Sequence, residues 1–243
     1  EVATFIATAK SRVADMSAAI RTSAIDESTP LGKIAREFNS LLLAGRRREA
    51  NRLILDTVDG EVDVRDVYLH IFQPSQYEIG RLWQRNEVTV AQEHYATAAT
   101  QMAMSLLYER IFNHDRVGRT LVATCVSSDL HEIGIRMVCD FFEMEGWDTF
   151  YLGANTPTDA VLQMVADRNA DLLAVSVTLS AHLDAVRDLI AAARADPRCA
   201  DTRILVGGLP FQVDRELWRK LGADGCAADA DTAVRLGNAL VEP

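Results

Sequence analysis

Short apolar runs alternate with helical stretches over the second half of the chain, and this alternation constrains the fold more than any other feature. Strands are predicted at Leu121–Val126, Asp148–Leu152, Leu172–Val177, Ile204–Val206 and Cys226–Ala228. Helices are predicted between and after them, at Ile133–Glu145, Thr158–Arg168, His182–Arg194, Arg215–Leu221 and Asp231–Leu240. Strands that alternate with helices build a doubly wound parallel sheet. We therefore expect an α/β domain with a five-stranded parallel sheet.

The first half of the chain follows a helical periodicity, because apolar residues recur there every three or four positions and glycines are sparse. An amphipathic helix is predicted at 1–24, and further helices near 31–44, 46–58, 62–85 and 89–113. Pro74 is expected to kink or split the helix at 62–85. The chain is thus expected to divide into an N-terminal helix and linker at 1–30, a helical bundle at 31–117 and the α/β domain at 118–243.

Composition excludes several classes of partner. The chain has 35 acidic and 25 basic residues and a net charge of −10, which argues against nucleic-acid binding because a phosphate backbone demands a basic surface. We interpret the run Arg46–Arg48 as a solvated helix face. The four cysteines form no C-x-x-C pair, a pattern compatible with a reducing compartment. No membrane-spanning stretch or signal peptide is recognised, so a cytoplasmic location is expected.

The loop after the first predicted strand places an aspartate beside a histidine. Ligands of doubly wound sheets bind beyond the carboxyl ends of the strands. Asp129 and His131 are close enough in sequence for the carboxylate to hydrogen-bond the imidazole, which would fix the tautomer and raise the basicity of the other ring nitrogen. Gly134 falls in the first turn of the next helix, where a missing side chain lets a ligand approach. Taken alone, the pair is also compatible with a surface histidine beside a chance aspartate.

Two further elements stand at the ends of later strands. Ser176-Val177-Thr178 ends the third predicted strand, and Gly207-Gly208 ends the fourth. Together with Asp129-x-His131-x-x-Gly134, and in this order, they resemble the signatures of the base-off, His-on cobalamin-binding domain, which has a Rossmann-like fold. Thr178 departs from the leucine of many members.

The resemblance implies cobalamin as the cofactor, with His131 as the lower axial ligand of the cobalt and Asp129 orienting its ring. It also implies that the two glycines make room for the dimethylbenzimidazole tail and that a hydroxyl of Ser128 or Ser176 extends the relay. His182 is interpreted as a cap or surface residue. The implied cofactor contacts in this domain are Ser128, Asp129, Leu130, His131, Glu132, Ile133, Gly134, Gly153, Ser176, Thr178, Leu179, Gly207 and Gly208.

A second motif lies in the predicted helical bundle. Trp83 ends one helix, and Glu93-His94 lie in the first turns of the next. Separately, a tryptophan at a helix end fits core or hinge packing and an adjacent Glu-His pair fits a solvated face. Ahead of a cobalamin domain, the pattern W-x9-E-H resembles the CarH-type B12 photoreceptors. That resemblance implies that the bundle caps the upper corrin face, where Trp83, Val90, Glu93 and His94 surround the 5′-deoxyadenosyl group of adenosylcobalamin.

The expected function is therefore a light-sensing module that is not itself an enzyme. Photolysis of the cobalt–carbon bond would rearrange the bundle and change a homo-oligomer, or the activity of a fused or separate effector domain. Gln84 departs from the histidine that often follows the tryptophan in CarH-type proteins, and their helix-turn-helix is absent. A photocobilin, with biliverdin as a second chromophore, is a variant of this interpretation. The alternatives are a corrinoid methyl carrier of a cobalamin-dependent methyltransferase and the cobalamin module of a radical mutase.

Overall fold

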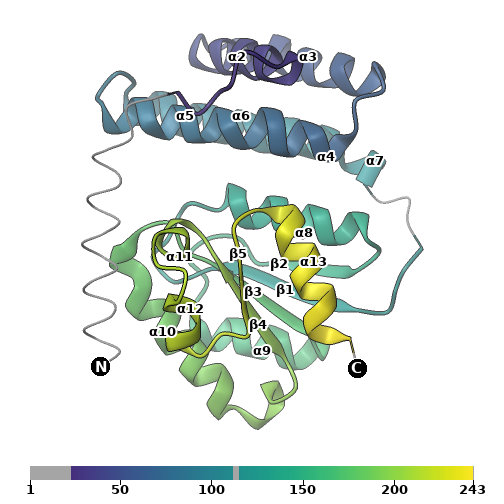
Figure 1. Cartoon of the computed structure of the whole chain (residues 1–243), viewed down its shortest axis with the longest axis vertical. Helices are drawn as coiled ribbons and strands as arrows, with labels where there is room; N and C mark the ends of the chain where they lie inside the picture. Colours follow the sequence, from purple (N-terminus) through teal and green to yellow (C-terminus); the bar gives the residue numbers. More distant parts are fainter. Residues whose placement is uncertain (1–22, 112–114, 243) are drawn as a thin grey trace. The chain divides into compact units, whose positions relative to one another are not determined.

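The computed structural model describes residues 23–111 and 115–242. These residues form two compact units, an all-helical one within Ile20–Asn113 and one that contains the sheet, within His114–Pro243 (Figure 1). The amphipathic helix predicted at 1–24 lies almost wholly outside the described residues, and the division at 30 and 117 stays a prediction. We describe each unit by itself.

The second unit is built on a five-stranded parallel sheet in the order β2-β1-β3-β4-β5. The strands are β1 Thr120–Cys125, β2 Asp148–Tyr151, β3 Leu172–Ser176, β4 Arg203–Gly207 and β5 Gly225–Ala227. The helices are α8 Ile133–Met144, α9 Thr158–Arg168, α10 Leu183–Ala195, α11 Leu209–Val213, α12 Leu217–Leu221 and α13 Ala230–Val241, with short 3-10 turns η2 Ser180–His182 and η3 Pro197–Cys199. The predicted doubly wound α/β architecture is confirmed.

Helices cover both faces of this sheet (Figure 1). α9, α10 and α12 share one apolar core with strand residues such as Leu173 and Val206. α8 and α13 pack together on the other face, where a Cβ added to Gly237 would lie 2.5 Å from Phe142 and 2.9 Å from Leu172. Leu172 and Leu173 thus point to opposite faces, as successive strand residues must. Because both faces are covered, the three central strands β1, β3 and β4 carry apolar runs, at 121–123, 172–175 and 204–206.

Helices are the regular elements of the first unit in its described residues, 23–111. They are α2 Pro30–Leu43, α3 Arg47–Asp59, α4 Val64–Val67, the π-helix η1 Tyr68–Phe72, α5 Gln73–Gln84, α6 Val90–Leu106 and α7 Tyr108–Ile111. Phe38 and Phe72 are both fully buried, with ring centroids 5.5 Å apart in the core. Pro74 neither ends the helix nor separates it into two. The wider π turn directly before Pro74 accommodates the missing N–H donor, so α4, η1 and α5 follow one another without a loop.

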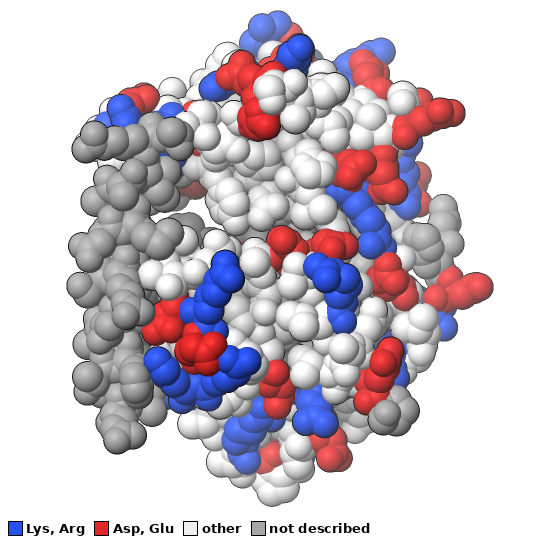
Figure 2. All heavy atoms as spheres, viewed as in Figure 1, with Lys and Arg blue, Asp and Glu red and all other residues white. Residues whose placement is uncertain are grey.

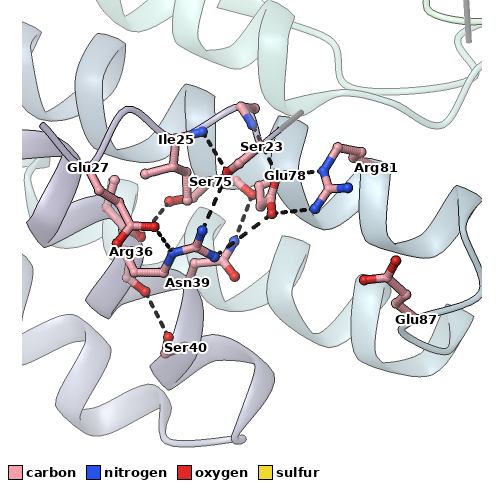
Figure 3. A network of polar contacts seen from close by, with 12 residues as sticks. Ser23, Ile25, Glu27, Arg36, Asn39, Ser40, Ser75, Glu78, Arg81 and Glu87 are labelled. Atoms are coloured by element: carbon pink, nitrogen blue, oxygen red, sulfur yellow. Dashed lines mark hydrogen bonds and ion pairs between the residues drawn. The ribbon is translucent and has the colours of Figure 1, made fainter. Parts of the chain in front are cut away.

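A buried carboxylate ties the segment before α2 to this bundle (Figure 3). Glu78 is only 1% exposed and accepts two hydrogen bonds of 2.8 Å from the guanidinium of Arg81. It also accepts the N–H of Ala24 at 3.1 Å, and Arg36 lies 3.9 Å from it. Arg36 in turn donates to Glu27 at 2.7 Å. The network therefore connects residues 23–27 with α2 and α5.

Charges of both signs are interleaved on the molecular face that Figure 2 shows, where Lys and Arg side chains lie beside Asp and Glu. No helix among residues 23–111 and 115–242 is long and apolar enough to cross a membrane.

Candidate functional site

The site lies where the winding of the sheet changes direction. β1 is flanked by β2 and β3, so the chain leaves β1 toward one edge of the sheet and leaves β3 toward the other. Loops that diverge at such a point leave a crevice at the carboxyl ends of the strands. The loop after β1 carries Asp129 and His131, and the loop after β3 carries Thr178 and His182. The fold thus brings residues about fifty positions apart to one place.

Asp129 joins these two loops. Its carboxyl group is fully buried, and Oδ1 accepts the backbone N–H of His131 at 3.0 Å and lies 2.8 Å from Nδ1 of the same residue. Oδ2 accepts the backbone N–H of Thr178 at 2.6 Å. Burial alone would raise the pKa of Asp129, but the hydrogen bonds from His131 and Thr178 outweigh it and hold the pKa well below its usual range. Asp129 is therefore ionised at neutral pH.

His131 is held by this carboxylate with its side chain 48% exposed. An ionised acceptor at Nδ1 selects the tautomer that carries a proton there, so Nε2 is the ring nitrogen suited to a metal. Leu130, 70% exposed, and Leu179, 45% exposed, lie on the same two loops. Exposed leucines on loops at the ligand edge of a sheet are suited to an apolar ligand.

The start of α8 is also open. Ile133 begins this helix and is buried, whereas no atom lies within 4 Å of a Cβ placed on Gly134. The glycine is therefore not demanded by packing within the protein. An open position in the first turn of a helix, beside an oriented histidine, fits a large flat ligand such as a corrin.

The backbone of the β1 loop is fixed by the loop after β2. Ser128 adopts a positive φ of 70°, and its N–H donates to Oδ1 of Asn155 at 2.8 Å. The N–H of Asn155 returns a bond of 3.2 Å to the carbonyl of Asp129. These reciprocal bonds hold the residue before Asp129 in an unfavourable backbone region, and so set the direction of the Asp129 side chain.

Glu132 reinforces the same connection. Its Oε2 accepts the hydroxyl of Tyr151 at 2.9 Å and the N–H of Ala154 at 3.0 Å. Burial, together with this bond, raises the pKa of Tyr151. Gly153, with φ of 76°, lies so close that an added Cβ would be 3.3 Å from Oε2 of Glu132. Both residues, expected as cofactor contacts, act here on the shape of the loop.

Backbone contacts explain why glycines stand at the end of β4. Gly208 has φ of 109°, and a Cβ there would lie 1.8 Å from the carbonyl oxygen of Val177. Gly207 pairs with Ser176 in the register of β3 and β4, and its Cβ would be 3.2 Å from the carbonyl of Ala227. The backbone at the end of β3 thus excludes a side chain at position 208, and one at position 207 would make a tight contact with the end of β5, whatever ligand lies beside them.

The polar group next to Asp129 is an imidazole and not a hydroxyl. In the described part of the chain, neither Ser128 nor Ser176 donates its hydroxyl to Asp129, and Thr178 contributes its backbone N–H. His182, interpreted from the sequence as a cap or surface residue, does occupy the N-cap position of α10, but its side chain makes no capping hydrogen bond. Its side chain is only 20% exposed, and its Nδ1 lies 3.5 Å from Oδ2 of Asp129. Its position near the end of β3, on the ligand side, was the one available signal.

The residues of the second motif lie in the helical unit. Trp83, 46% exposed, stands at the end of α5, and Val90, 53% exposed, begins α6. Glu93 is 25% exposed, accepts the hydroxyl of Thr97 at 3.0 Å and pairs with Nδ1 of His94, whose side chain is 73% exposed. Trp83 is therefore not a core residue of this unit, and His94 extends into solvent.

Comparison with known protein families relates both units to one cofactor. Residues 119–236 match a family model described as "B12 binding domain", and residues 34–108 match a second model with the same description. Both units match B12-binding domains. Together with the exposed Leu130 and Leu179 on the two loops of the site, these matches support cobalamin as the cofactor of this chain.

Relatives extend over most of the chain. It is 21% identical to dimethylamine corrinoid protein 1 of Methanosarcina acetivorans, over 80% of this chain and 92% of that protein. It is 22% identical to a corrinoid protein of Desulfitobacterium hafniense, over 84% of this chain and 96% of that protein. The solved structure of the monomethylamine corrinoid protein of Methanosarcina barkeri has the same fold, with a TM-score of 0.74 and 18% identity over 84% of this chain and 96% of that one.

These relatives correct the predicted family and function. The resemblance to CarH-type photoreceptors is wrong, because the full-length relatives are corrinoid proteins of another kind. The prediction of a light-dependent homo-oligomer with a sensory effector partner depended on that resemblance and is also wrong. The error has a physical cause: W-x9-E-H comprises three residues on two adjoining helix ends, all of them partly or largely exposed, and such positions accept these residue types for many reasons.

Proposed function

We propose that this chain is a corrinoid methyl carrier, the alternative interpretation of its sequence. Two relatives that match at least four fifths of its length are named as corrinoid proteins, one of them as a dimethylamine corrinoid protein. The chain itself would not catalyse methyl transfer. Its partners would be methyltransferases that load and unload the bound cofactor. The cytoplasmic location stays a prediction.

The observation that carries the cofactor part of the proposal is the buried Asp129 that holds Nδ1 of His131. In the proposal His131 ligates cobalt through Nε2, and Asp129 fixes the tautomer and the ring orientation that ligation requires. Gly134, Leu130 and Leu179 form the open, apolar surroundings of a corrin. When bound, cobalamin supplies a cobalt centre that can accept a methyl group from a donor and release it to an acceptor.

A carrier of this kind would hold cobalamin that bears a methyl group in place of the predicted adenosyl group. Nothing in the comparisons supports biliverdin. The helical unit, with Trp83 and Val90 on its surface, is the second of the two segments that match B12-binding domains. We propose that it takes part in cofactor binding.

The ligand assignment is tested by the His131→Ala variant loaded with hydroxocobalamin. We expect it to lose the absorption spectrum of histidine-ligated cobalamin and to bind about 10- to 100-fold more weakly. His70→Ala is the matched control, because the side chain of His70 is 57% exposed and lies in the helical unit, where it pairs with Asp66. An unchanged spectrum in His131→Ala would show that another group ligates the cobalt.

The carrier function is tested by identifying the group on the cobalt. The full chain is isolated in the dark from cells supplied with cobalamin, and the cofactor is extracted and analysed by mass spectrometry. We expect methylcobalamin, or cobalamin without an alkyl group after the methyl has been passed on. Recovery of the 5′-deoxyadenosyl form as the main species would contradict a methyl carrier.

A further inference from the structure

His182 is an unassigned imidazole beside the central carboxylate. It stands at the start of α10, where its backbone N–H donates to the carbonyl of Leu179 at 2.9 Å. Its Nδ1 is buried and makes no hydrogen bond with any described residue, yet it lies 3.5 Å from Oδ2 of Asp129. A buried polar atom without a partner is costly, and a nearby ionised acceptor can remove that cost.

The charge of Asp129 decides which tautomer His182 can adopt. A bare Nδ1 would direct a lone pair at the buried carboxylate, which is repulsive in a site with little water. A protonated Nδ1 would direct a donor at Oδ2. At 3.5 Å the pair is at the long end for a hydrogen bond, so the bond requires the His182 ring to move slightly closer to Oδ2.

We propose that His182 is a positioning residue for the cobalt ligand, acting through Asp129. Its Nδ1–H donates to Oδ2, the oxygen that also accepts the N–H of Thr178, while Oδ1 holds Nδ1 of His131. The carboxylate is thereby fixed from both sides and cannot turn away from the His131 ring. The third member of the relay is an imidazole in place of the hydroxyl expected from the sequence.

This inference rests on the proposed function in one respect: the orientation of His131 matters only if His131 ligates the cobalt. The contact itself belongs to the protein without cofactor. Its first test is therefore a nitrogen-15 NMR measurement of the imidazole tautomers in the full chain, before and after loading with hydroxocobalamin. We expect His182 to carry its proton on Nδ1 in both states. A proton on Nε2 with a bare Nδ1 would overturn the proposal.

The second test compares two substitutions of similar size. His182→Asn keeps a donor close to the position of Nδ1, whereas His182→Leu removes it. We expect His182→Leu to bind hydroxocobalamin about tenfold more weakly, with a smaller fraction in the histidine-ligated spectrum, and His182→Asn to stay within about threefold of the unmodified chain. Equal loss in both variants, or no loss in His182→Leu, would contradict the positioning role.

The two tests separate failure of this inference from failure of the proposed function. If His131→Ala keeps its spectrum and affinity, the cobalt ligand is misassigned, but the tautomer of His182 in the protein without cofactor still reports the contact with Asp129. Should His182→Leu not fold, that tautomer measurement decides the matter in the unmodified chain.

Discussion

Asp129 is the residue on which the candidate site depends. Its two oxygens hold groups from the loops after β1 and β3, and it remains charged although it is fully buried. A buried carboxylate is retained only where it is compensated, and here backbone N–H groups and an imidazole compensate it. The pair Asp129–His131 was predicted from the sequence. The hydrogen bond from Thr178 and the position of His182 were not predicted, because a local sequence pattern does not indicate contacts between residues so far apart in the chain.

Substitution of two glycines near the site distinguishes a residue needed for folding from one needed for cofactor binding. Gly208→Ala combines a left-handed backbone with a Cβ that would lie 1.8 Å from the carbonyl oxygen of Val177. We expect it to lower the free energy of unfolding by at least ~3 kcal/mol in urea titrations, or to prevent folding. Gly134→Ala has open space for its methyl group, so it should fold at least as stably as the unmodified chain but bind hydroxocobalamin more weakly.

The contrast between these two variants is the informative result. If Gly134→Ala binds the cofactor as tightly as the unmodified chain, the open start of α8 is not part of the corrin surface. A stable Gly208→Ala variant would mean that the ends of β3 and β4 can separate more easily than their close approach suggests.

At the scale of elements, the Glu78 network determines how the segment before α2 is held. Arg81 holds the pKa of Glu78 below its usual range, against the opposing effect of burial. Glu78→Gln removes the charge but leaves Arg81, whose side chain is only 12% exposed, without its counter-ion. We expect a loss of about 3 kcal/mol of stability at pH 7, measured by denaturant unfolding followed by circular dichroism.

The same network gives a defined pH dependence. Because folding lowers the pKa of Glu78, its stabilisation is complete above the pKa of the unfolded chain, about 4.3, and is lost as pH falls through the lower folded value. The difference between Glu78→Gln and the unmodified chain should therefore shrink in acid. Glu216→Gln is the control, since the side chain of Glu216 is 60% exposed and lies in the other unit. A pH-independent difference would argue against the ionised pair.

The π turn before Pro74 lets a helix continue where the sequence predicts an interruption. Proline predicts an interruption, since it cannot donate to the carbonyl four residues earlier. The structure keeps the helical path by widening one turn, with Tyr68 and Phe72 fully buried in the core. Burial of those aromatic rings favours continuation of the helix over a break, and this is a tertiary effect.

For the whole molecule, the match of both units to B12-binding domains matters more than any short motif. The photoreceptor interpretation rested on three residues, whereas the corrinoid relatives cover four fifths of the chain. A methyl carrier needs no rearrangement on loss of an adenosyl group. We therefore expect gel filtration of the adenosylcobalamin-loaded chain to give the same elution volume in the dark and after green illumination. A light-dependent shift in elution would contradict this expectation.

The sequence by itself determined the doubly wound sheet, the helical first half and the pair Asp129–His131, because periodicity and near neighbours are local properties of a chain. The order β2-β1-β3-β4-β5 was decided in three dimensions, and it placed the β3 loop beside the β1 loop. Only then did His182 face Asp129, Gly208 meet Val177, and Glu132 become a link between loops. The physical reason is that hydrogen bonds and steric contacts depend on distance in space, which spacing along the chain does not encode.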